Sequence, residues 1–158
     1  MIDEIKIIEN IQKLNINQLM IIISKPFNTF GFLMMLLFFY QYKILNKKDI
    51  DVIGAGSILN LIIKIIFKRT RPYQKYSSVR NFSNKVHNNI FDKYSFPSGH
   101  TFSSTLLSLI LLTKYKDQTI INLIPLFVGL SRVFLGVHYP SDILFGLIIG
   151  FIYFKIAY

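Results

Sequence analysis

Residues 28–67 read NTFGFLMMLLFFYQYKILNKKDIDVIGAGSILNLIIKIIF, and this stretch decides the class of fold. It consists of two apolar blocks, 28–45 and 52–67, which are separated by the short basic segment NKKDID. An α-helix needs about 20 apolar residues to cross a bilayer, and roughly 17 is the usual lower limit. Both blocks lie close to that limit, so we predict two transmembrane helices joined by a short loop.

Further apolar blocks follow at 100–115, 120–135 and 143–158. The chain has 158 residues, of which 52% are hydrophobic, and its mean hydropathy is +0.44. A soluble protein with buried helices is the alternative, but too little polar sequence remains to cover five such helices. We therefore predict an all-α fold, a polytopic membrane helical bundle with about five transmembrane helices, in a single domain over 1–158.

The first 27 residues follow a different pattern. Between 2 and 23, apolar residues recur every three or four positions among charged ones, namely Asp3, Glu4, Lys6, Glu9 and Lys13. This pattern is typical of an amphipathic helix that lies in the membrane interface, and we expect such a helix over 1–27. The early carboxylates and the lack of a small-residue cleavage site argue against a signal peptide.

The composition excludes several kinds of site. The chain has no cysteine, which rules out disulfides, iron–sulfur clusters and thiolate zinc sites. Only three histidines and eight carboxylates are present, so we predict no metal and no cofactor. The net charge of +10 is compatible with binding of anionic lipid or nucleic acid.

The connections between the apolar blocks differ in length. The 68–99 segment is long and polar, and together with 131–142 it is expected on one face of the membrane. The short basic segments 46–51 and 114–118 then fall on the other face. Within the blocks, glycines at 54, 56, 146 and 150 are expected to permit close helix packing.

Lys64 interrupts the apolar block 52–67, where a charged side chain costs roughly 2.5–3.5 kcal/mol at the centre of a bilayer. Arg71 follows seven residues later, about two helical turns, so both side chains could point the same way. Pro72 then biases the chain out of the helix. Two cations at one membrane surface suit a bound anion, although Lys64 near a helix end could simply reach the interface.

Residues 96–101 read FPSGHT and have the features of a helix start. Ser98 is a preferred N-cap residue, and the backbone N–H groups and positive dipole end of a helix favour a phosphate there. Gly99 permits the close approach of a ligand, and His100 falls in the first turn. The segment alone is equally compatible with an ordinary cap followed by an incidental histidine.

Residues 131–142 read SRVFLGVHYPSD and contain a cation, a histidine and a carboxylate. Arg132 is near the end of the fourth block, His138 lies in the turn, and Asp142 begins the fifth block. Asp142 could cap the following helix. It could equally hold one nitrogen of His138 and leave the other nitrogen available for attack, as a carboxylate does in nucleophile–base–orienter sites.

Together, these three segments resemble the signature of the type 2 phosphatidic acid phosphatase family, which includes bacterial lipid phosphate and undecaprenyl-diphosphate phosphatases and shares its site with vanadium haloperoxidases. The matching positions are Lys64, Arg71, Pro72, Pro97, Ser98, Gly99, His100, Ser131, Arg132, His138 and Asp142. The signature covers 64–142. The larger family members have six spans, whereas five spans and an interfacial helix are expected here.

The resemblance implies a role for each site residue. His138 attacks phosphorus and forms a phosphohistidine, Asp142 orients it, and His100 first protonates the leaving oxygen and then activates water. Lys64, Arg71 and Arg132 bind the equatorial oxygens of the phosphate, with help from the Ser98 hydroxyl and the Gly99 amide. The third histidine, His87, matches no motif position and is interpreted as a loop residue.

The implied function is that of a metal-independent membrane phosphatase acting on a lipid phosphate or diphosphate, such as phosphatidic acid, phosphatidylglycerophosphate or undecaprenyl diphosphate. A lipid phosphotransferase could use the same residues, and a non-catalytic protein that binds anionic lipid would also explain the charge. Nucleic acid is not an expected partner. The resemblance to bacterial members favours a multi-pass plasma-membrane protein with an outward-facing site. Basic residues occur on both predicted faces of the membrane, so the positive-inside rule does not decide the orientation.

Overall fold

The computed structural model describes residues 3–83, 85, 87, 92–115 and 119–158, and every regular element among them is a helix. The N-terminal elements are α1 (Glu4–Gln12), α2 (Asn17–Ser24), the 3₁₀ turn η1 (Lys25–Phe27) and α3 (Thr29–Gln41). The remaining elements are α4 (Lys47–Phe67), α5 (Pro72–Lys75), α6 (Gly99–Lys114), η2 (Thr119–Leu123), α7 (Ile124–Phe134) and α8 (Pro140–Ala157). The prediction of an all-α membrane bundle is confirmed.

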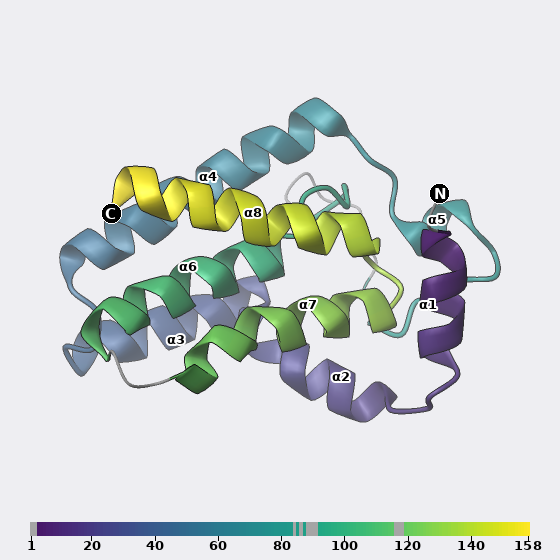
Figure 1. Cartoon of the computed structure of the whole chain (residues 1–158), viewed down its shortest axis with the longest axis horizontal. Helices are drawn as coiled ribbons and strands as arrows, with labels where there is room; N and C mark the ends of the chain where they lie inside the picture. Colours follow the sequence, from purple (N-terminus) through teal and green to yellow (C-terminus); the bar gives the residue numbers. More distant parts are fainter. Residues whose placement is uncertain (1–2, 84, 86, 88–91, 116–118) are drawn as a thin grey trace.

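Helix α6 is the centre of the bundle. It packs against α4, α7 and α8, and its side chains Phe102, Leu106 and Ile110 are completely buried. In Figure 1, α4, α6 and α8 run along the long axis of the molecule, while α1 stands across one end. The end next to α1 is where α4 stops and where α6 and α8 begin, so residues from three helix ends can meet there.

Local capping explains where the long helices begin. The side chain of Asn46 accepts a hydrogen bond from the amide of Asp49, and the Asp49 carboxylate accepts one from the amide of Asn46. Ser98 caps α6 through Thr101, as the sequence predicted. Helix α8 starts with Pro140, whose fixed φ suits the first turn. These caps satisfy backbone groups that would otherwise be exposed at the helix ends.

The predicted number of five spans is not confirmed. By length and composition, two helical stretches of the described chain could cross a membrane, Lys47–Lys75 and Pro140–Ala157. A third span is possible if the pair Asn17–Phe27 and Thr29–Gln41, which bends by 55°, forms one broken crossing. Helices α6 and α7 are too short to qualify, with 16 and 11 residues. Exposed apolar side chains of α3, α4 and α8 form the outer surface, among them Leu33, Leu37, Ile62, Ile66, Ile148 and Ile152.

The prediction of one helix over 1–27 is wrong, because α1, α2 and η1 share this segment. The break includes Asn15, whose φ of 50° is left-handed, a conformation that asparagine adopts more readily than most residues. The two helices pack on different parts of α7 and its surroundings, and Ile8 of α1 is buried among Val79, Val133 and Tyr139. The interfacial location of this segment stays a prediction.

The two short basic connections lie together at the end of the bundle opposite to α1. Lys114 at the end of α6 forms an ion pair of 2.7 Å with Asp49 at the start of α4. Lys48 donates to the carbonyl of Tyr158 at 3.0 Å, which brings the end of α8 to the same place. The 116–118 part of the second connection lies outside the described residues. The described parts agree with the prediction that these connections share one face.

Candidate active site

The three sequence segments meet at a cavity of about 480 Å³, called here the site cavity. Six of the eight predicted site residues line it: Lys64, Arg71, Gly99, His100, Arg132 and His138. The other two, Ser98 and Asp142, are fully buried immediately beside it. They come from the last turn of α4, the start of α5, the start of α6, the end of α7 and the start of α8. The structure therefore brings the eight predicted site residues together.

Three buried cations surround the site cavity, and each is held by oxygen atoms. Lys64 Nζ donates to the carbonyls of Pro97 and Tyr94 at 2.7 and 3.1 Å. Arg71 Nη1 donates to the carbonyl of Val137 at 2.7 Å. Its Nε and Nη2 both donate to the carbonyl of Asp92. These contacts fix the direction of each charge before a ligand arrives.

The third cation, Arg132, is also buried and is incompletely paired. Its Nη1 donates to the hydroxyl of Ser24 in α2 at 2.5 Å, while its Nε has no hydrogen-bond partner among the described residues. Three like charges that are shielded from water repel one another strongly. An anion with several oxygens would offset that repulsion and supply the missing acceptors, and a phosphate has this chemistry.

His138 has the surroundings of a neutral imidazole. Burial, and then the positive charges of Arg71 and Lys64, hold the pKa of His138 well below its usual range. Its Nε2 faces Arg71 Nη1 at 3.2 Å, so this nitrogen points toward the cations. Because a guanidinium only donates, Nε2 of a neutral ring accepts this bond through its lone pair, and the same lone pair can act as a nucleophile once Arg71 binds a phosphate oxygen instead.

Asp142 lies against the other ring nitrogen of His138. Its Oδ2 is 3.4 Å from His138 Nδ1, which is longer than a good hydrogen bond, and the same oxygen accepts from the amide of Tyr139 at 2.9 Å. Catalytic hydrogen bonds are often long before substrate binds. Both interpretations of the sequence hold geometrically, since Asp142 caps α8 and also lies beside the imidazole.

The start of α6 forms a second wall of the site cavity. The Ser98 hydroxyl accepts from the Thr101 hydroxyl at 2.9 Å, so it is partly used in capping the helix. A Cβ placed on Gly99 would lie 3.4 Å from Asn60 Oδ1 and 3.8 Å from Lys64 Cε, which places this backbone directly opposite the cations. His100 follows in the first turn and lines the same cavity.

Among the polar residues that line the site cavity, sequence reasoning did not identify Asn60 and His87 as part of the site. Asn60 precedes Lys64 by one helical turn, and its Nδ2 is buried without a partner among the described residues. The i, i+4 spacing to Lys64 is a signal that could have identified it. His87 was interpreted as a loop residue, yet it is buried, lines the cavity and contacts the Tyr73 hydroxyl at 3.1 Å. No spacing in the 68–99 segment indicated this position.

The site cavity also has an apolar part, called here the apolar groove, which is lined by Phe27, Phe32 and Leu33 of the N-terminal segment and by Ile58 and Leu61 of α4. Several of these positions belong to the apolar outer surface, with Leu33 and Ile58 more than half exposed. A ligand with a charged head and an apolar tail would find a matching environment for both parts.

Comparison with known proteins agrees with this geometry. Phosphatidylglycerophosphatase B of Bacillus subtilis is 31% identical over 130 residues, which are 75% of this chain and 59% of that protein. Undecaprenyl-diphosphatase BcrC of the same organism is 30% identical over 112 residues, 65% of this chain and 53% of that protein. Lipid A 4'-phosphatase of Porphyromonas gingivalis is 31% identical over 128 residues, 73% of this chain and 53% of that protein. The matched part is thus between 53% and 59% of the length of these relatives.

Two solved structures share the fold. The crystal structure of Aquifex aeolicus LpxE has a TM-score of 0.78 at 22% identity, over 96% of this chain and 92% of that one. A transmembrane PAP2-type phosphatidylglycerolphosphate phosphatase from Bacillus subtilis has a TM-score of 0.71 at 25% identity, over 96% and 83%. The sequence profile of the PAP2 superfamily matches residues 50–158, which contain all the motif residues. This chain belongs to the PAP2 superfamily.

Proposed function

We propose that this protein is a membrane-embedded phosphatase that hydrolyses a lipid phosphate or diphosphate at the site cavity. One observation carries the proposal: Nε2 of the buried His138 lies 3.2 Å from Arg71 Nη1, in a cavity that is lined by buried cations and by the residues of the apolar groove. A protein that only binds anionic lipid would need the cations, but it would have no use for a buried His138 aligned with Asp142.

The reaction would proceed in two displacements. His138 Nε2 forms a bond to phosphorus while the bond from phosphorus to the lipid oxygen breaks, and His100 gives a proton to that oxygen. Water, deprotonated by His100, then attacks the phosphohistidine, and the phosphorus–nitrogen bond breaks to release phosphate and restore His138. In both steps Lys64, Arg71 and Arg132, with the Gly99 amide and the Ser98 hydroxyl, would stabilise the charge on the equatorial oxygens.

The substrate class follows from the groove and from the relatives. Phosphatidylglycerophosphate and undecaprenyl diphosphate are named for relatives, and both combine a phosphate with long apolar chains. In this protein the phosphate would occupy the cations and the chain would follow Phe32, Leu33 and Ile58 toward the bilayer. We further propose that the protein resides in a plasma membrane with the site facing outward.

The test is phosphate release from a panel of lipids in detergent, with phosphatidic acid, phosphatidylglycerophosphate and undecaprenyl diphosphate as substrates. We expect turnover of at least one lipid in excess chelator, because three side-chain cations neutralise the phosphate. Vanadate should inhibit, because it can adopt the five-coordinate geometry of the transferred group. Turnover that disappears in chelator and returns with magnesium would contradict the mechanism, and absence of any turnover would contradict the function.

A further inference from the structure

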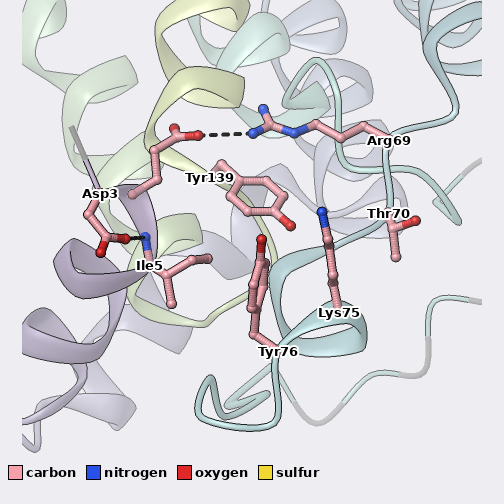
Figure 2. Close-up of a pocket in the computed structure, with 8 residues that line it drawn as sticks. Asp3, Ile5, Arg69, Thr70, Lys75, Tyr76 and Tyr139 are labelled. Atoms are coloured by element: carbon pink, nitrogen blue, oxygen red, sulfur yellow. Dashed lines mark hydrogen bonds and ion pairs between the residues drawn. The ribbon is translucent and has the colours of Figure 1, made fainter. Parts of the chain in front are cut away.

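Arg69 contacts four residues next to the site, namely Asp142, Ser141, Glu4 and Tyr139. Its Nη1 donates to Asp142 Oδ1 and to the Ser141 hydroxyl, both at 2.7 Å, and its Nη2 donates to Glu4 Oε2 at 3.0 Å. The guanidinium lies 3.8 Å from the ring centroid of Tyr139. Figure 2 shows Arg69 beside Tyr139, among the residues that line a second cavity of about 550 Å³.

Glu4 at the start of α1 completes this arrangement. Its Oε1 accepts from the backbone amide of Ser141 at 2.7 Å, so the carboxylate binds Arg69 and the first turn of α8 at once. Burial alone would raise the pKa of Glu4, but the hydrogen bonds from Ser141 and Arg69 outweigh it and lower that pKa. Glu4 is therefore negatively charged at neutral pH, and it fixes Arg69 from the side opposite to Asp142.

We propose that Arg69, held by Glu4, is a positioning residue that orients Asp142 and, through Asp142, the nucleophile His138; this inference rests on the proposed function. Asp142 is completely buried, and its two oxygens have separate partners. Oδ2 faces His138 and the amide of Tyr139, whereas Oδ1 faces Arg69. Arg69 thus sets the rotation of the carboxylate and offsets its charge, which a buried anion requires to remain ionised.

Helix α1 would thus support catalysis by holding Glu4 against Arg69. Helix α1 precedes the segment 50–158 that matches the family profile. It is anchored independently of Glu4, because Ile8 is buried against Val133, Tyr139 and Ile143. A firmly packed helix can hold the Glu4 carboxylate in place, and this makes the Glu4–Arg69–Asp142 chain rigid from the surface to the nucleophile.

The test compares purified variants of the full chain in detergent, with kcat, KM and the pH profile measured on the best lipid substrate. Arg69→Gln should lower kcat about 10- to 100-fold, with little change in KM, by analogy with the loss caused by removing a group that orients a ligand in metal sites. In the pH profile of kcat for this variant, the fall on the acid side, called here the acid limb, should move to higher pH, because the buried carboxylate of Asp142 takes up a proton more readily without its cation. Arg69→Lys should keep the limb near its original position while losing part of kcat, since lysine keeps the charge but not the forked geometry.

Glu4→Gln gives the opposite electrostatic change. It removes a negative charge from Arg69, so kcat should fall less than in Arg69→Gln and the acid limb should not move to higher pH. Lys75→Gln is the matched control for Arg69, because Lys75 is an exposed cation that lines the same 550 Å³ cavity. Glu9→Gln is the control for Glu4, as a carboxylate of the same helix with no partner among the described residues. Both controls should behave like the wild type.

The outcomes separate the two proposals. An active wild type with unchanged kcat in Arg69→Gln would overturn this inference alone. The inference would also be overturned if kcat fell in parallel with thermal stability while the acid side of the kcat–pH profile did not move in either Arg69 variant. If Arg69→Gln does not fold, the Arg69→Lys and Glu4→Gln variants decide the question, because a kcat equal to that of the wild type in both would contradict positioning. A wild type that hydrolyses no lipid would overturn the proposed function and this inference with it.

Discussion

The segment 50–158 and the N-terminal 3–49 contribute differently to the site. The C-terminal segment matches the family profile and carries all the motif residues. The N-terminal segment carries none of them, yet it touches the site at two points: Ser24 accepts from Arg132, and Glu4 accepts from Arg69. It also supplies one wall of the apolar groove, through Phe27, Phe32 and Leu33.

The 50–158 segment thus contains the residues proposed to contact the phosphate, whereas the N-terminal segment contains residues that hold some of them in place. The residues that would contact the phosphate must have fixed identities, because a nucleophile and three cations cannot be replaced by other groups. Supporting residues need only an acceptor in the right place, and a serine hydroxyl or a carboxylate from any nearby helix provides one. Predictions that compare the two segments should therefore show large losses of kcat in the first and graded losses in the second.

The largest effect is expected from His138, the proposed nucleophile. His138→Ala should lower kcat by about 10⁴- to 10⁶-fold, as loss of a catalytic nucleophile does in other covalent enzymes, and no phosphoenzyme should form on any substrate. His100→Ala removes a proton donor, which contributes about 10²- to 10⁴-fold. It should retain a phosphoenzyme burst on an activated aryl phosphate, whose leaving group needs no proton.

Rapid-quench measurement of the burst distinguishes these roles, because His100 would also be needed for breakdown of the intermediate. The burst of His100→Ala should be better preserved on the aryl phosphate than on phosphatidic acid. A phosphoenzyme in His138→Ala, or equal loss of the burst in both variants on every substrate, would show that the assigned roles are wrong.

The next effect compares Arg132 with its N-terminal partner. Arg132→Gln removes a charge from the site cavity and should lower kcat about 10²- to 10³-fold, the loss typical of a group that stabilises a developing oxyanion. Ser24→Ala removes only one acceptor of Arg132, so a loss of about 10-fold is expected. Ser57→Ala is the control, because Ser57 also lines the cavity but its hydroxyl donates to Ile53 of its own helix. If Ser24→Ala equals Arg132→Gln, the division between chemistry and support fails.

The sequence predicted the site better than it predicted the helices around it. The motif residues were identified because the three segments together resemble a family signature, whereas each segment alone also had an ordinary structural interpretation. The number of spans was harder, because α6 and α7 are short and their ends are set by Ser98 and Leu135 rather than by hydropathy. The break at Asn15 was missed for a related reason, since the apolar periodicity continues across it.

The glycines show the same limit of sequence reasoning. Close packing was predicted for Gly54 and Gly56 alike, but a Cβ on Gly54 would meet nothing within 4 Å. A Cβ on Gly56 would lie 2.8 Å from side-chain atoms of both Leu106 and Tyr153. Only the packed structure tells which face of α4 each glycine occupies, so the prediction for Gly54 is wrong and that for Gly56 is confirmed.

A pair of stability measurements follows from this contrast. Gly56→Ala should destabilise the fold by about 1–3 kcal/mol, because the added methyl group is wedged between α6 and α8. Gly54→Ala should be neutral or slightly stabilising, because alanine favours a helix by up to about 1 kcal/mol over glycine. Thermal unfolding in one detergent compares them. Equal shifts of Tm would contradict the packing of α4 in this structure.

The smallest effect is expected from His87, which lies within the 50–158 segment but matches no motif position. Burial, followed by the positive charges of Arg71 and Arg132, lowers the pKa of His87 to about 3. The unfolded chain has an ordinary histidine pKa near 6.5, so between these values it binds a proton that the folded protein rejects. The stability contributed by neutral His87 is therefore complete above about pH 6.5 and decreases as the pH falls below it.

We expect His87→Gln, which keeps a polar group for Tyr73, to lose less stability between pH 7.5 and 5 than the wild type, by on the order of 1 kcal/mol. Other titrating groups are common to both proteins and cancel in the difference. Parallel stability curves over this range would mean that His87 is protonated in the fold, contrary to its buried position beside the cations.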